Sequence, residues 1–131
     1  MATIEEAVVV RMGGDAGLTA LIGTRLFPLR VPQDADMPAI AYQKISSPKT
    51  HSHSGSSHLA QSRIQFTCEA DDYATAKAVA NAVRDCWDGF AGTVDGVRID
   101  SALVQDDRDG WSEEHAAPVV RVDVMVWHYE Q

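Results

Sequence analysis

The sequence has no acidic residue between Asp36 and Glu69, although the chain as a whole is acidic. It has 19 acidic and 11 basic residues among 131, for a formal net charge of −8. The basic residues inside the acid-free window are Lys44, Lys49 and Arg63. Residues 37–68 therefore carry +3 against −11 for the remainder, a layout that suggests binding to another surface. An acidic body that simply keeps the protein soluble is the plainer alternative.

Several other features are scarce. Clustered lysines and arginines are missing, which argues against general affinity for nucleic acid, because phosphate contacts require grouped basic side chains. No apolar run approaches the roughly 18 residues that cross a bilayer, and the N-terminus lacks a signal-peptide pattern. Only two cysteines occur, Cys68 and Cys86, each within an apolar periodic segment. We therefore expect a soluble intracellular protein, not bound to membrane, whose thiols are reduced and buried.

Length and a hydrophobic fraction of 45% fit a single domain over residues 1–131. Periodic apolar spacing and capping residues predict helices over 4–12, 18–22 and 73–87, the first opened by a Thr3 and Glu6 capping box. Turn residues and alternation predict strands over 25–27, 39–45, 59–69, 97–104 and 119–129, with an exposed connection over 105–117. This order predicts an α+β fold, with the helices packed on one face of a mostly antiparallel sheet.

The strands at 39–45 and 59–69 form a hairpin arm, about 39–69, whose thirteen-residue tip far exceeds the usual loop of about two to five residues. The tip contains His51, His53 and His58 but no cysteine or carboxylate. Ordering such a loop around a metal would cost conformational entropy for few fixed ligands, so a solvated polar loop is favoured. No nucleophile-elbow or phosphate-binding sequence occurs either. We therefore expect no metal, no cofactor and no enzymatic activity.

The last strand has two different faces. Val120, Val122, Val124 and Val126 share one face, and Arg121, Asp123, Met125, Trp127 and Tyr129 share the other. Two interpretations of the large apolar groups on the second face remain open. Either the N-terminal helix covers them, or they form an exposed stripe that pairs with another subunit.

Several short segments, in this order and spread over nearly the whole chain, resemble the tail-completion (tail-terminator) proteins of long-tailed bacteriophages and gene transfer agents. The segments are Ile4–Val8 with Leu18–Leu21, Arg25–Pro28, Pro38–Tyr42 with Ile45 and Ser46, Ala60–Glu69, Tyr73–Lys77, Asp106–Asp109, and the closing Trp127–Tyr129.

This resemblance implies a structural virion protein that forms a six-membered ring on the head-proximal end of the tail tube. The ring would end tube polymerisation and dock the tail to the head connector. The implied partners are other copies of the chain, the tail-tube protein and a head–tail connector or adaptor protein, while DNA passes through the lumen without specific binding. The implied location is the head–tail interface of the virion, reached from the host cytoplasm during assembly, and the arm loop would become ordered as the ring forms.

The residues expected to make these contacts are Lys49, His51 and His53 with a neighbouring ring or subunit, Lys44 and Arg63 along the arm, and Trp127 and Tyr129 at a subunit boundary. Two other functions remain as alternatives. One is a head–tail adaptor or neck protein that docks to the portal side, and the other is a small enzyme or metal-dependent regulator.

Overall fold

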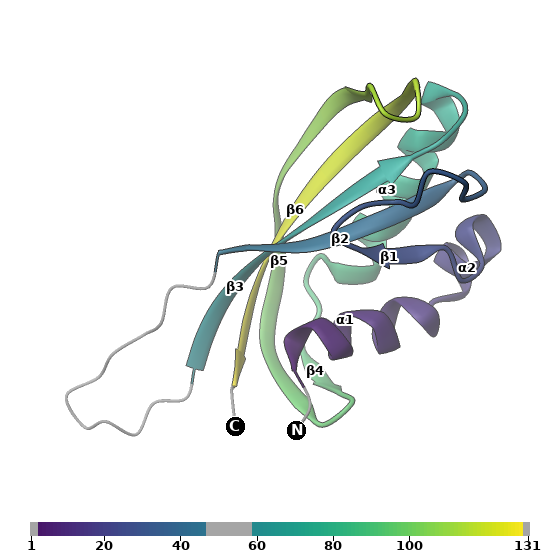
Figure 1. The fold of residues 1–131 in the computed structure, drawn as a ribbon. Coiled ribbons are helices and arrows are strands. Elements are labelled where there is room, and N and C mark those ends of the chain that lie inside the picture. The colour runs from purple at the N-terminus through teal and green to yellow at the C-terminus, as the bar shows by residue number, and fades with distance from the viewer. Residues whose placement is uncertain (1–2, 47–58, 130–131) are drawn as a thin grey trace.

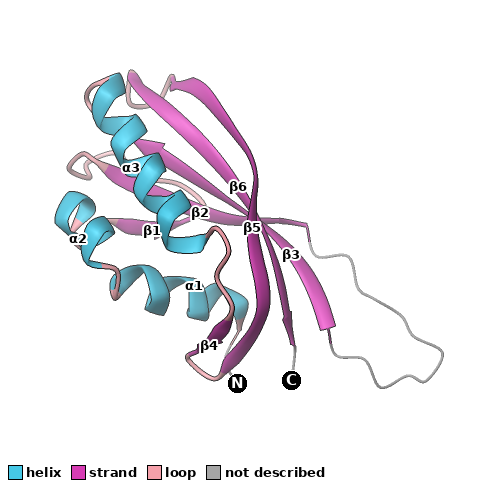
Figure 2. Cartoon of the chain, turned by 180° about the vertical axis from the view of Figure 1, so that it is seen from behind, coloured by secondary structure: helices cyan, strands magenta, loops and turns pink. Residues whose placement is uncertain are grey.

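The computed structural model describes residues 3–46 and 59–129. Its elements are α1 (Ile4–Gly13), α2 (Ala16–Ile22), β1 (Leu26–Pro28), β2 (Ala39–Ser46), β3 (Leu59–Glu69), α3 (Tyr73–Trp87), β4 (Gly92–Val94), β5 (Val97–Ser112) and β6 (Ala117–Tyr129). These strands form one sheet in the order β1-β2-β3-β6-β5-β4. Only the β1–β2 pair is parallel. The helices all lie on one face of the twisted sheet (Figures 1 and 2), which confirms the α+β prediction.

Local capping residues explain where the helices begin. The Thr3 hydroxyl accepts from the Glu6 N–H, and the Glu6 carboxylate accepts from the Thr3 N–H, which is the predicted capping box. The Asp72 carboxylate accepts from the Thr75 N–H at 2.7 Å, so α3 begins where its sequence predicts. Asp15 caps α2 in the same way, and this helix therefore starts two residues earlier than expected.

The core lies between the helices and the sheet. Trp87, at the end of α3, is fully buried and stacks on Phe66 of β3, with ring centroids 6.3 Å apart. The Arg11 side chain of α1 donates hydrogen bonds to the Cys86 carbonyl and lies over the Phe90 ring. Because the last carbonyls of a helix have no partner within the helix, this arginine ties α1 to the C-terminal end of α3.

The last strand divides as its alternation predicts. The valines at 120, 122, 124 and 126 are buried in the same cluster as the buried side chains of α1 and α3. Since α1 packs on this valine face, the interpretation in which it covers Met125, Trp127 and Tyr129 is wrong. These three side chains lie on the opposite face and are half-buried.

Residues 105–112 differ from the prediction. They form the second half of β5 and pair with β6 from Asp106↔Asp123 to Ser112↔Ala117, so only 113–116 connect the two strands. The short strand β4 was also not predicted. The predicted turn at Asp95 and Gly96 joins β4 to β5, with both residues at positive φ.

The base of the predicted arm is present. β2 and β3 pair antiparallel from Ala39↔Glu69 to Lys44↔Ile64, and the register shifts before Ser46↔Arg63. The rest of the tip, residues 47–58, lies outside the described residues, and so do Lys49, His51 and His53. No helix in the described ranges is long and apolar enough to cross a membrane.

Candidate interaction surface

The face of the sheet opposite the helices, here called the open face, has a buried carboxylate at its centre. The Asp123 side chain is only 3% exposed, and its Oδ2 lies 2.6 Å from Arg63 Nη2 and 3.6 Å from Arg108 Nη1. Gln65 Nε2 donates to its Oδ1 at 3.2 Å. Two cations and an amide compensate the buried charge. The arrangement fixes the guanidinium of Arg63, a predicted contact residue, against the open face at the base of the arm.

Lys44, the other predicted contact in the arm strands, lies on the opposite side of the sheet. It is aligned with Ile64, whose side chain is buried among the helices, and its Nζ lies 3.6 Å from Glu5 Oε1 of α1. The structure therefore separates Lys44 from Arg63. An ion pair between half-exposed side chains adds little stability, so Lys44 remains accessible to a partner.

Trp127 and Tyr129 lie on the open face at the end of β6 where the described part of the arm ends. Trp127 is aligned with Gln61 of β3, and Tyr129 with Leu59. The Arg98 guanidinium lies 5.0 Å from the centroid of the Tyr129 ring, within the range of a cation–π contact. The predicted grouping of these residues on one face is confirmed, while their role at a subunit boundary stays a prediction.

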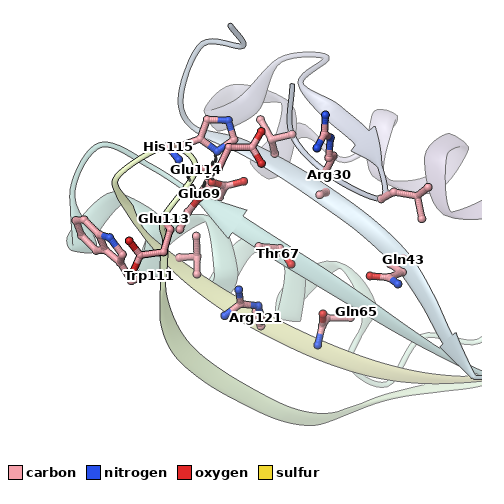
Figure 3. Close-up of a pocket in the computed structure, with 15 residues that line it drawn as sticks. Arg30, Gln43, Gln65, Thr67, Glu69, Trp111, Glu113, Glu114, His115 and Arg121 are labelled. Atoms are coloured by element: carbon pink, nitrogen blue, oxygen red, sulfur yellow. Dashed lines mark hydrogen bonds and ion pairs between the residues drawn. The ribbon is translucent and has the colours of Figure 1, made fainter. Parts of the chain in front are cut away.

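A groove of about 400 Å³ hollows the other end of the open face (Figure 3). Its floor is formed by polar side chains of β2, β3 and β6, namely Gln43, Gln65, Thr67 and Arg121. Arg30 and Trp111, the latter 54% exposed, also line it. A side chain at Gly110 would collide with the Arg121 guanidinium, so this glycine lets the arginine lie against β5. Sequence reasoning missed the groove because four separate segments of the chain line it.

His115 closes one end of this groove. Its Nδ1 lies 2.9 Å from Glu69 Oε1 and its Nε2 lies 3.2 Å from the Pro32 carbonyl. Both neighbours are acceptors, so a ring nitrogen of His115 that carries a hydrogen can donate to the neighbour it faces. The Ser112 hydroxyl also accepts from the His115 backbone N–H. One side chain thus joins the β5–β6 turn to the end of β3 and to the loop after β1.

The acidic half of β5 contacts α3 on the other face. The Tyr73 hydroxyl donates to Asp109 Oδ2 at 2.7 Å, Lys77 Nζ lies 3.3 Å from Asp109 Oδ1, and Arg84 lies 3.0 Å from Asp107. The hydrogen bond from Tyr73 is the main cause that lowers the pKa of Asp109. The hydrogen bond from Lys77 to Asp109 is the main cause that raises the pKa of Lys77. These contacts offset part of the acidic charge and allow an aspartate-rich segment to remain in the sheet.

Neither cysteine thiol is activated as a nucleophile. Cys68 and Cys86 are free and buried, and burial raises the pKa of both, that of Cys86 to about 12. Among the described residues, no three histidine, cysteine, aspartate or glutamate side chains are grouped to hold a metal ion. The tip histidines considered as ligands lie outside those residues.

Comparison with known proteins identifies a family and solved structures with a similar fold. The family model described as tail completion protein gp17 matches residues 6–129, nearly the whole chain. A chain in a solved structure described as the virion of a native gene transfer agent (GTA) particle has a similar fold, with a TM-score of 0.75. The two chains are 18% identical, and the match covers 92% of this chain and 90% of the other. No curated protein sequence matches significantly.

Proposed function

Because this chain belongs to the family of tail completion protein gp17, we propose that it forms a ring that closes the head-proximal end of a phage-type tail tube. Membership of this family makes it a structural protein of such a tail rather than a member of a known class of enzyme. The family match over residues 6–129 is the observation that carries the proposal. The fold shared with a chain of a gene transfer agent virion supports a location within the particle.

In the proposed ring, six copies of the chain surround the path of the DNA and dock the tail to the head connector. A ring that closes the tube needs one surface toward the last tube subunits and another toward the connector. The net charge of −8 favours passage of DNA without binding, because acidic side chains repel phosphates. Tail-tube subunits and connector subunits are the proposed partners of the two ring surfaces.

The arm is the proposed contact between this ring and its neighbours. Its two strands contact the body of the protein, through the ion pair of Arg63 with the buried Asp123 on one face and through the weak Lys44–Glu5 pair on the other. We assign Lys49, His51 and His53 of the tip to contact with the adjacent ring or subunit. A tube end presents a repeated set of contact sites, which favours assembly there over assembly in free solution.

Deletion of residues 48–57 tests the arm. We expect a folded protein, because the deletion leaves the cores of β2 and β3 intact, that no longer caps tails. Electron microscopy of particles made with this variant would then show tails of uncontrolled length or tails without heads. A variant that replaces the same ten residues with glycine and serine separates the effect of the tip's side chains from that of its length. Normal particles from both variants would show that the arm assignment is wrong.

Co-sedimentation of the intact protein with purified tail tubes and with tail-less heads tests the ring itself. We expect binding to the tubes. Binding only to heads would instead identify a head–tail adaptor and would overturn the proposed capping of the tube.

A further inference from the structure

Most of the large apolar side chains that the described residues expose lie along two opposite flanks of the sheet. The β5 flank carries Tyr73, Leu103 and Trp111, the β2 flank carries Leu29 and Ile45, and Val9 and Val10 lie on α1 beside Tyr42 and Asp95. Tyr73 belongs to the β5 flank because its hydroxyl bonds to Asp109. Single exposed apolar residues are normal on a protein surface. The position of five of these seven side chains on the two flanks points to a contact that covers both.

Each flank also has an unpaired strand edge. β4 pairs with β5 over Val97–Ile99. Further along the same edge of β5, the Ala102 carbonyl accepts from the Gly89 N–H, and the Val104 N–H donates to the Asp88 carboxylate. Within the described chain, residues 105–112 of β5 have no partner on that side. On the other flank β1 covers β2 only as far as Tyr42, which leaves the edge of 43–46 uncovered by any described strand. An open edge can accept a strand from another chain.

The directions of the strands allow these edges to join. β2, β3, β6 and β5 are antiparallel neighbours in turn, so β5 runs opposite to β2. Placing β5 of one copy beside β2 of the next would therefore continue the sheet as an antiparallel pair. Such a contact uses two different surfaces and is heterologous, and repeating it closes a ring when the rotation between copies divides a full turn.

The shapes of the flanks are complementary. A hollow of about 420 Å³ lies along the β2 flank, and a second of about 320 Å³ lies between α1, Tyr42 and Asp95 of the β4–β5 turn. Leu29 lines the first hollow, and Val9 and Val10 line the second. The β5 flank instead projects aromatic side chains, with Trp111 54% and Tyr73 49% exposed. A projecting aromatic side chain that fills a pocket is a common anchor of protein interfaces.

The β5 flank is acidic, whereas the edge of β2 itself has no acidic side chain, although Glu5 of α1 lies beside it. Residues 105–114 hold five acidic side chains and one basic side chain, Arg108. Residues 37–68, which include the β2 edge, hold no acidic side chain. The like charge of two β5 flanks therefore disfavours contact between them.

We propose that the β5 flank of one copy binds the β2 flank of a second copy, with an aromatic side chain of the first in the hollow lined by Leu29 and Tyr42 of the second. The sheet then continues antiparallel from copy to copy. This inference rests on the proposed ring and specifies which surfaces build it.

Cross-linking of two single-cysteine variants tests the contact. Gln43→Cys places a thiol on the β2 flank and Gln105→Cys places one on the β5 flank, and both positions are exposed. Equal amounts, one of them isotope-labelled, are treated with a short bismaleimide and weighed by mass spectrometry. We expect cross-linked mixed dimers from the mixture and no cross-linked dimers from either variant alone. The double variant should give a series of cross-linked oligomers up to the size of the ring. The native thiols are buried and serve as internal controls.

Dimers formed by one variant alone would indicate contact between identical flanks and would overturn the inference. Absence of mixed dimers in a preparation that light scattering shows to be oligomeric would also overturn it, while leaving the ring intact. If the protein stays monomeric in solution, the same cross-linking is carried out on protein bound to purified tail tubes, and absence of mixed dimers there overturns the inference while binding to the tubes decides the ring separately.

Two tryptophan variants distinguish the flanks from the open face. Trp111→Ala should lower the yield of mixed dimer about tenfold, since interface anchors contribute at least that factor. Trp127→Ala, on the open face at the end of β6, should lower it less. A larger loss of mixed dimer from Trp127→Ala than from Trp111→Ala would show that the contact lies on the open face and would overturn the flank assignment.

Discussion

At the scale of single residues, Asp123 is the most constrained group on the open face. A buried carboxylate is costly unless it is paired and hydrogen-bonded, and here Arg63, Arg108 and Gln65 supply those contacts. The cations are half-exposed and can return to water, whereas the carboxylate cannot. Replacement of Arg63 alone should therefore lower the free energy of unfolding more than replacement of both Arg63 and Asp123.

The double-mutant cycle of Arg63→Met and Asp123→Val measures this asymmetry. Arg63→Met alone should lower the free energy of unfolding by about 2 kcal/mol, less than for a fully buried pair because Arg63 is partly solvated and Arg108 remains. Adding Asp123→Val should recover more than half of the loss, because it removes the unpaired buried charge. Urea denaturation of the four proteins gives these values. A double variant less stable than Arg63→Met would contradict the assignment.

At the scale of elements, α3 shows how one cap decides where a helix begins. Asp72 accepts the Thr75 N–H, and the hydrogen bonds from Thr75 lower the pKa of Asp72. A carboxyl whose pKa is lowered by folding stabilises the protein above its unfolded pKa of about 3.9, and this contribution is lost as the pH falls through the folded value.

Asp72→Ala should therefore lower the urea midpoint at pH 7 but have a much smaller effect at pH 3. Asp71→Ala, a change in the preceding aspartate, is the matched control and should shift the midpoint little at either pH. Midpoints measured for the three proteins at both pH values check this expectation. An equal loss at pH 7 and pH 3 would show that the carboxylate charge does not contribute to the cap.

At the scale of the whole molecule, His115 joins segments that are distant in the sequence. Its partners Glu69 and Pro32 lie 46 and 83 residues away, so it couples the end of β3, the loop after β1 and the β5–β6 turn. Because the Glu69 side chain is only 6% exposed, loss of this partner leaves a buried carboxylate with less compensation.

His115→Ala should lower the free energy of unfolding by roughly 2 kcal/mol and speed amide hydrogen exchange in residues 29–38 and 113–117. Glu114→Ala is the control from the same turn, since it keeps the backbone carbonyl that accepts from Gln33. Hydrogen exchange followed by mass spectrometry reports both segments separately. Faster exchange in 113–117 alone would show that the histidine does not hold the 29–38 loop.

The parts of the fold that were predictable are those whose signals are local. The caps at Thr3 and Asp72 and the apolar spacing that follows them define α1 and α3, and strict alternation defines the two faces of β6. The same alternation placed Trp127 and Tyr129 on one face. These features depend on residues a few positions apart, so the sequence carries them without knowledge of the rest of the molecule.

The second half of β5, the groove and the two flanks were decided by tertiary structure. Asp106, Asp107 and Asp109 have low strand propensity, and they lie in a strand because β6 supplies hydrogen bonds while α3 and Arg108 supply cations. The sequence alone determined the helices, the hairpin base, the charge separation and a recognisable family pattern. Sheet order and packing alone determined which distant side chains meet, because those contacts join residues that no local period relates.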